Sequence, residues 1–124
     1  MIIYDWPPNT DEETKKMKNV ATAYRGNIYC PGGPLRDDII IHEEVHLRQQ
    51  GDDYDGWIAK YCSDLDFMID QEVEAYREQL KFLEKTKGHS YTLVATVSFA
   101  KFLSSEVYGK VISLDEAIKR QPLS

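Results

Sequence analysis

His42 and His46 lie four residues apart with Glu43 between them, in the run His42-Glu43-Glu44-Val45-His46, which is the HExxH pattern. Two histidines at this spacing lie on one face of a helix, one turn apart, so both imidazoles can reach a single metal ion. Glu43 projects about 100° round the helix, close enough to an open coordination position of that ion to hold a water molecule. The spacing therefore indicates a metal site with a carboxylate base beside it.

The residues around the motif argue against a chance match on a polar surface helix. The helix is rich in apolar side chains, namely Ile39, Ile40, Ile41, Val45 and Leu47. They cover most of its circumference, which predicts that the helix is buried. Because buried histidines need partners, this setting favours a real site.

A catalytic zinc ion has three protein ligands, and the downstream candidates for the third are Glu72, Glu74 and His89. On the helix expected over residues 64–86, a rotation of about 100° per residue places Glu72 within an apolar stripe and Glu74 on the opposite, charged side. The stripe consists of Leu65, Met68, Ile69, Tyr76, Leu80 and Leu83. The geometry therefore favours Glu72.

A carboxylate within a buried stripe is costly unless a cation or hydrogen-bond donors compensate its charge. A zinc ion shared with His42 and His46 would compensate Glu72. The alternative is that Glu72 pairs with a buried arginine or lies near a helix end. We predict His42, His46 and Glu72 as the ligands of one metal ion.

The HExxH run and the later run Glu72-Val73-Glu74-Ala75-Tyr76 together resemble the gluzincin metallopeptidases. In that family the third ligand begins an E-x-x-A-(Asp, Asn or Tyr) run on a second helix. The hairpin before the first motif, and Gln49-Gln50 after it, are similar to compact bacterial and bacteriophage versions of the fold. The resemblance covers about residues 19–84. It implies a minimal zincin-like domain, and it would suit a phage-encoded protein.

The resemblance also implies an activity, the hydrolysis of peptide bonds in a peptide or protein substrate. One Zn²⁺ would be held by His42, His46 and Glu72, and Glu43 would be the general base for the zinc-activated water. An edge strand formed by Asn27, Ile28, Tyr29 and Cys30 would align the substrate by β-addition.

Three further residues are candidates for supporting roles. In many gluzincins, an Asp four residues after the glutamate ligand supports one of the ligand histidines. This sequence has Tyr76 at that position, which could support a histidine or simply pack on the apolar stripe. The oxyanion needs a hydrogen-bond donor besides the metal. Tyr76, His89 and Tyr91 are candidates for that donor, and the sequence does not rank them.

Two other functions are consistent with the same residues. The first is a non-catalytic zinc-binding structural or assembly protein, for instance a phage component on a peptidase-like fold, because the chain lacks the large second subdomain of bigger gluzincins. The second is a binding module whose HExxH is accidental, which predicts no stoichiometric zinc.

The elements that must position the site begin with a strand over 2–6, which Pro7-Pro8 ends, and a polar helix after a Thr10–Glu13 capping box. A hairpin follows, with strands over 20–24 and 27–30 around the Arg25-Gly26 turn. Helices are expected over 37–50, 54–62, 64–86 and 90–105, although Val and Thr leave the last open to strand. A capping box at Ser113–Glu116 opens a short final helix.

These elements predict an α+β domain with a small antiparallel sheet packed on the HExxH helix and a mostly helical C-terminal part. The 124 residues fit one domain, 1–124. The net charge of −6, without a basic patch, argues against a nucleic-acid partner. No signal peptide or membrane span is recognisable, so we expect a cytoplasmic protein without a membrane partner. Cys30 and Cys62 are expected to be reduced thiols.

Overall fold

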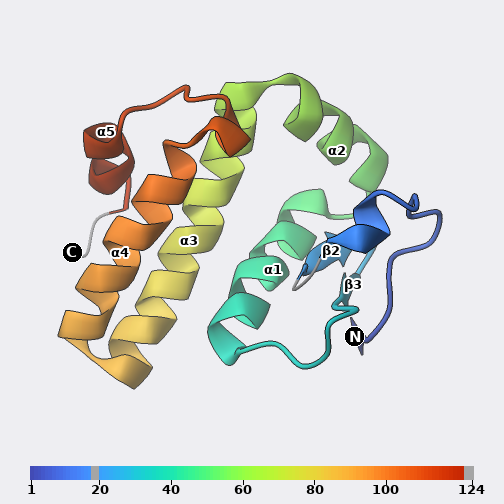
Figure 1. The fold of residues 1–124 in the computed structure, drawn as a ribbon, viewed down its shortest axis with the longest axis horizontal. Coiled ribbons are helices and arrows are strands. Elements are labelled where there is room, and N and C mark those ends of the chain that lie inside the picture. The colour runs from blue at the N-terminus through green and yellow to red at the C-terminus, as the bar shows by residue number, and fades with distance from the viewer. Residues whose placement is uncertain (18–19, 122–124) are drawn as a thin grey trace.

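The computed structural model describes residues 1–17 and 20–121, and its elements follow the α+β order expected from the sequence (Figure 1). The strands are β1 (Ile2–Ile3), β2 (Thr22–Tyr24) and β3 (Asn27–Tyr29). The helices are α1 (Asp37–Gln50), α2 (Tyr54–Ser63), α3 (Leu65–Lys87), α4 (His89–Leu103) and α5 (Leu114–Lys119), with single 3-10 turns η1 (Thr14–Lys16) and η2 (Glu106–Tyr108). In Figure 1, α1 lies between the sheet and the α3–α4 pair, and α2 spans one end.

The sheet has the strand order β1-β3-β2, so β3 is its central strand. β2 runs antiparallel to β3, and the turn between them has positive φ at both Arg25 (45°) and Gly26 (86°). Positive φ at both central residues is the geometry of a type I′ hairpin turn. The predicted hairpin is therefore confirmed. The sheet as a whole is mixed and not antiparallel, because β1 adds to β3 in parallel.

The chain before β2 contains less regular structure than we predicted. β1 ends at Ile3 instead of Trp6, because the chain bends at Tyr4 and Asp5, where the Trp6 amide donates to the Asp5 side chain (2.7 Å). The predicted helix after Thr10 is only the single turn η1, and the Thr10 hydroxyl donates to the Pro7 carbonyl (2.6 Å) and caps no helix. No residue described in this segment is fully buried, so it has no buried apolar face that would stabilise a longer helix.

The helices begin and end close to the residues predicted for them. Asp53 and Asp64 accept hydrogen bonds from backbone amides in the first turns of α2 and α3 (both 3.0 Å), and Ser113 does so for α5 (3.1 Å). Gly51 and Gly88 end α1 and α3 with φ values of 55° and 89°, which a glycine adopts without strain. Capping chemistry therefore sets half of the ends of the five α-helices.

α4 is a helix in spite of its Val and Thr content. Its buried threonine hydroxyls donate to the carbonyls four residues earlier, Thr92 to Gly88 (2.8 Å) and Thr96 to Thr92 (2.8 Å). These bonds satisfy the hydroxyls inside the helix pair. Within the described residues, no helix has both the length and the apolar character needed to cross a membrane.

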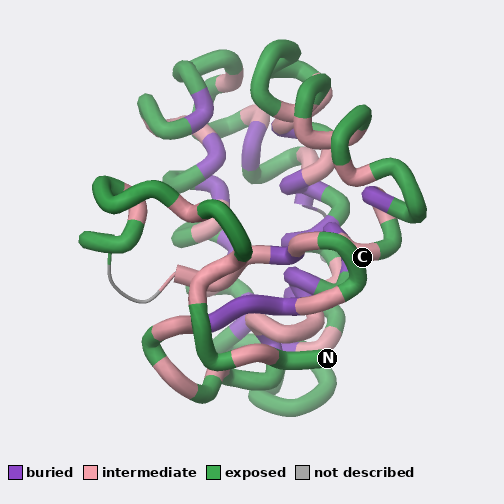
Figure 2. Tube along the Cα trace, turned by 90° about the vertical axis from the view of Figure 1, so that its right-hand side faces the viewer, coloured by how far each residue is buried: buried purple, intermediate pink, exposed green. Residues whose placement is uncertain are grey.

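The apolar core joins α3, α4, η2 and α5. Its buried members are Ile69, Val73, Tyr76, Ala100, Leu103, Tyr108 and Ala117. Figure 2 shows buried positions gathered on the inner sides of the helices, whereas the first described residues are exposed or intermediate. The core fixes α3 against α4, and α3 in turn packs along α1, which carries the HExxH motif. Cys30 and Cys62 are both free thiols, as expected.

Candidate metal centre

Two histidines of α1 and one glutamate of α3 meet inside the protein. His42 Nε2 lies 3.2 Å from Glu72 Oε1, and His46 Nε2 lies 2.8 Å from Glu72 Oε2. The two Nε2 atoms are 3.2 Å apart, and all three residues are buried. The side-by-side packing of α1 and α3, seen in Figure 1, brings the three side chains together.

The separation of these atoms fits a metal ion bound in tetrahedral geometry. Zinc binds imidazole nitrogen and carboxylate oxygen at about 2.0–2.2 Å, which places its ligand atoms about 3.3 Å from one another. The observed separations of 2.8 and 3.2 Å are close to that spacing. The buried group His42, His46 and Glu72 can therefore hold a metal ion.

A glutamine fixes each histidine from the side opposite the cluster. Nδ1 of His42 lies 2.9 Å from Gln79 Oε1, and Nδ1 of His46 lies 2.8 Å from Gln49 Oε1. An amide oxygen only accepts hydrogen bonds, so each Nδ1 carries a proton and donates it. The lone pair of each neutral imidazole is then on Nε2, the atom that faces the cluster.

Two tyrosine hydroxyls complete the surroundings of Glu72. Tyr61 of α2 donates to Oε2 (2.9 Å), and Tyr108 of η2 donates to Oε1 (3.3 Å). Among the described residues, the ion-pair partners of Glu72 are the two histidines, and no arginine takes that place. Burial opposes ionisation, but His42 and His46 outweigh it and hold the pKa of Glu72 well below its usual range.

Glu43 is also buried and faces the same pocket as the cluster. Burial raises the pKa of the Glu43 carboxyl to about 7, against the opposing charges of His46 and His42. Burial alone would lower the pKa of His46, but the hydrogen bond and the charge of Glu72, helped by Glu43, raise it to about 9. A carboxyl group that titrates near neutrality is suited to accept a proton and release it again.

The cluster opens into a pocket of about 350 Å³. One wall is the segment 21–23, which includes the first residues of β2, and another is α2 with its aromatic side chains. Trp57 and Tyr61 stack on each other with ring centroids 4.9 Å apart, and both pack near His46. The residues lining the pocket are Ala21, Thr22, Ala23, His42, Glu43, His46, Tyr54, Trp57, Ile58, Tyr61, Glu72, Tyr76, Phe102 and Tyr108.

Tyr76 supports His42 by packing. Its ring meets the imidazole edge-on at a centroid distance of 4.6 Å and stacks on Phe99 at 4.5 Å. The hydrogen bond that the resemblance allowed at position 76 is made instead by Gln79. Tyr76 therefore belongs to the stripe and to the pocket lining.

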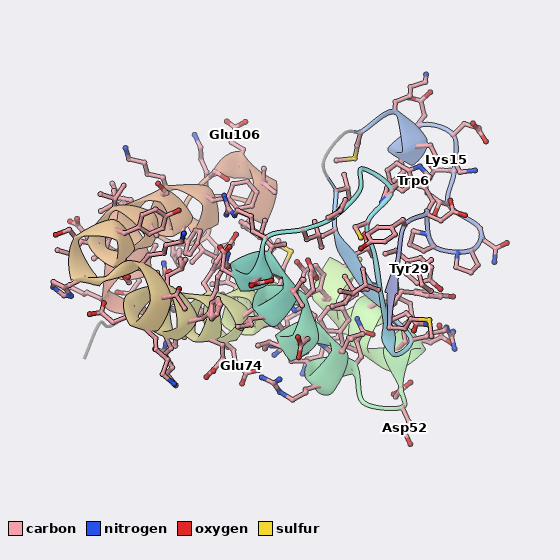
Figure 3. The ribbon with its side chains drawn as sticks, turned by 90° about the horizontal axis from the view of Figure 1, so that it is seen from below. Trp6, Lys15, Tyr29, Asp52, Glu74 and Glu106 are labelled. Carbon is pink, nitrogen blue, oxygen red and sulfur yellow. The ribbon has the colours of Figure 1, made fainter. Side chains whose placement is uncertain are left out.

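Glu74 lies outside the cluster, unlike Glu72. Its side chain is exposed on the outer side of α3, as Figure 3 shows, and accepts a hydrogen bond from Gln49 Nε2 (2.8 Å). The two glutamates thus lie on opposite sides of the helix, as the rotation per residue predicted. Glu74 reaches the site only indirectly, through Gln49 and His46.

His89 and Tyr91 lie too far from the cluster to act on an oxyanion there, so their prediction as donors is wrong. They begin α4, at the end of α3 opposite to Glu72, and the helical rise puts them roughly 20 Å away. His89 is 63% exposed and pairs with Glu84 at 3.1 Å. Among the described residues, the hydroxyls that donate to Glu72 are those of Tyr61 and Tyr108.

The strand predicted to align a substrate was also assigned wrongly. Asn27, Ile28 and Tyr29 form the central strand, and the Cys30 amide donates to the Ile3 carbonyl (2.8 Å), so both edges of this segment are covered by other strands. The edge strand beside the pocket is β2. The hairpin pattern predicted that β2 and β3 pair, but it did not predict that β1 pairs with the other edge of β3.

Sequence reasoning missed several residues that hold the cluster. Gln49 lies one helical turn after His46, and Gln79 lies two turns after Glu72, so helical spacing could have identified both. Asp38 lies one helical turn before His42 on α1, so the same spacing could have placed it on that face. Tyr108 reaches the site only through the packing of η2 against α3, and its position in the sequence carries no such signal.

The metal-free protein should lose stability as the pH rises through 9. The pKa of His46 is raised from 6.5 to about 9, so its contribution is complete below pH 6.5 and is lost above pH 9, a change of roughly 3 kcal/mol. The pKa of Glu43 is raised from 4.5 to about 7, so its ionisation also lowers the free energy of unfolding as the pH rises from 4.5 to 7. Urea unfolding after chelation, at pH 6 and at pH 9 or above, measures the loss. A free energy of unfolding that is flat or rising over this range would contradict the assignment.

Comparison of the chain with protein-family models, with curated proteins and with solved structures finds no match. The function must therefore be inferred from the residues and the geometry of the site.

Proposed function

We propose that the protein is a zinc-dependent metallopeptidase of the minimal zincin-like, gluzincin type. The observation that carries the proposal is the meeting of His42 Nε2, His46 Nε2 and the Glu72 carboxylate at one buried point. Two nitrogen lone pairs and a carboxylate facing one another repel unless a cation or a proton lies between them. A metal ion satisfies all three at once.

The chemistry of the donor atoms favours zinc. Calcium and magnesium prefer oxygen ligands, whereas two imidazoles and one carboxylate are a common ligand set of catalytic zinc. Such a site leaves a coordination position for water or substrate. The pocket beside Glu43 provides room for both. We propose one zinc ion for each chain.

A zinc ion held by His42, His46 and Glu72 would activate a water molecule and polarise the carbonyl of the bond to be cut. Glu43 would accept the proton from the attacking water and pass it to the leaving amine. Its pKa of about 7 suits both steps near neutral pH. Tyr61 and Tyr108 each donate their single hydroxyl proton to Glu72, so either would have to turn from Glu72 to donate to the developing oxyanion.

An extended peptide would add to the outer edge of β2. The Ile28 amide of β3 donates to the carbonyl of Met1, just before β1, so Ala23 opposite Ile28 directs its backbone groups away from β3. The Ala23 carbonyl already accepts a hydrogen bond from Gln50 Nε2 (2.7 Å). Pairing would therefore involve Ala21, two residues earlier on the same side of the segment and part of the pocket wall.

Metal analysis and peptide cleavage test the proposal together. Protein purified without a histidine tag should contain about one zinc ion per chain, and a peptide library should be cleaved by the zinc form but not after chelation. One zinc ion without cleavage would indicate the non-catalytic zinc protein. Absence of stoichiometric zinc would refute both metal-based functions and leave the accidental motif.

A further inference from the structure

We propose that Asp38 and Gln79 form a relay that decides which nitrogen of His42 carries its proton. Asp38 Oδ2 accepts from Gln79 Nε2 at 2.7 Å, and Gln79 Oε1 lies 2.9 Å from His42 Nδ1. Asp38 and Gln79 are only 6% and 3% exposed. Both are positioning residues, because neither touches the metal position. The consequence for zinc affinity rests on the proposed zinc site, whereas the relay itself does not.

The relay has a direction because its first member can only accept hydrogen bonds. An amide group has a donor end and an acceptor end of nearly the same shape, and it can turn round to exchange them. The Asp38 carboxylate selects the donor end, so the acceptor end must face His42. The imidazole then carries its proton on Nδ1 and directs the Nε2 lone pair at the cluster. Asp38 also accepts two hydrogen bonds from the Arg36 guanidinium, Nε to Oδ1 at 3.1 Å and Nη2 to Oδ2 at 3.2 Å.

The second histidine is held by a different arrangement, which provides an internal control. Gln49 Nε2 donates to the exposed carboxylate of Glu74 (2.8 Å) and also to the backbone carbonyl of Gln71 (3.0 Å). A backbone carbonyl only accepts, and no substitution at Glu74 changes that. The orientation of Gln49 is therefore secured twice, whereas that of Gln79 depends on Asp38.

Asp38→Asn is the variant that no longer fixes the orientation of the Gln79 amide. Asparagine nearly preserves the size of Asp38 but offers both a donor and an acceptor, so the Gln79 amide can turn and present Nε2 to His42. The proton of His42 would then move to Nε2 in part of the molecules. We expect the dissociation constant for zinc to rise about tenfold or more. Nitrogen-15 NMR of the metal-free protein at alkaline pH should show a fraction of the Nε2–H tautomer of His42.

The double variant Asp38→Asn/Gln79→Glu distinguishes the relay from a loss of packing. The new carboxylate at position 79 can only accept hydrogen bonds, so it takes one from the asparagine and one from His42 Nδ1. The Nδ1–H tautomer should return, and zinc affinity should recover to within a few-fold of the starting protein. Glu74→Gln, the matched control at the other histidine, should change neither readout.

The outcomes separate the relay from the proposed function. The relay is refuted if Asp38→Asn leaves both the tautomer and the zinc affinity unchanged, or if the double variant binds zinc no better than the single one. It is also refuted if Glu74→Gln has the same effect as Asp38→Asn. If the unaltered protein bound no zinc, the proposed function would fail, and the tautomer of His42 would still decide the relay.

Discussion

Replacing Glu43 by glutamine is expected to leave one zinc ion bound and to lower peptide hydrolysis by about 100-fold or more. Glu43 lies between the two histidines on α1, but it is not a member of the His42, His46 and Glu72 group. Glutamine has almost the same size and cannot accept a proton near neutral pH. Loss of a general base typically lowers a rate by about 10²- to 10⁴-fold. Zinc content by metal analysis and kcat with a cleaved library peptide measure the two effects.

Glu44→Gln is the matched control for this variant. It makes the same change of charge one residue away, on an exposed side chain. Zinc content and hydrolysis should both stay near their starting values, because surface substitutions away from a site usually have small effects. Retention of full activity in Glu43→Gln would refute the role of Glu43. An equal loss in both variants would point to a general effect of charge on the helix.

The parts of the site that lie on one helix could be predicted from the sequence. The HExxH spacing determines which side chains share a face of α1, and the helical rotation separates Glu72 from Glu74 on α3. Both relations depend on a single helical period, which does not change when the helix packs. The helix bounds were predictable for a similar reason, because capping residues such as Asp64 and glycines such as Gly88 act locally.

The parts that depend on packing between distant segments could not be predicted. β1 pairs in parallel with β3 and covers its outer edge, and nothing near Ile28 in the sequence indicates that. Tyr108 reaches Glu72 because η2 packs against α3, although 36 positions separate the two residues. His89 was a candidate only because its position along the helix pair was unknown, and the length of α3 excludes it.

The helix predicted after Thr10 does not form for the opposite reason. Its capping residues are present in the sequence, but no packing stabilises a helix there. Thr10 and Glu13 have the spacing of a capping box, yet a helix there would have no apolar face to bury. A helix shorter than about 12 residues is marginal without such packing. The chain therefore forms only one turn, at η1, and leaves Thr10 to bond to Pro7.

Replacing Glu72 by alanine is expected to reduce zinc affinity by more than about 100-fold, whereas Glu74→Ala should leave it nearly unchanged. Glu72 would supply one of the three ligand atoms, so its loss should exceed the 10- to 100-fold effect typical of residues that only support a ligand. Glu74 touches the site only through Gln49, which the Gln71 carbonyl also holds.

The same pair of variants should separate in thermal stability. Zinc at 100 times its dissociation constant stabilises a folded protein by about 2.7 kcal/mol. Added zinc should therefore raise the melting temperature of the unaltered protein and of Glu74→Ala, but not that of Glu72→Ala. Glu72→Gln keeps the size of the side chain and an oxygen for Tyr61 or Tyr108, so it tests for the carboxylate charge with less loss of packing. Equal zinc affinities in Glu72→Ala and Glu74→Ala would show that the ion is not bound by His42, His46 and Glu72, and the assignment of the metal centre would fail with it.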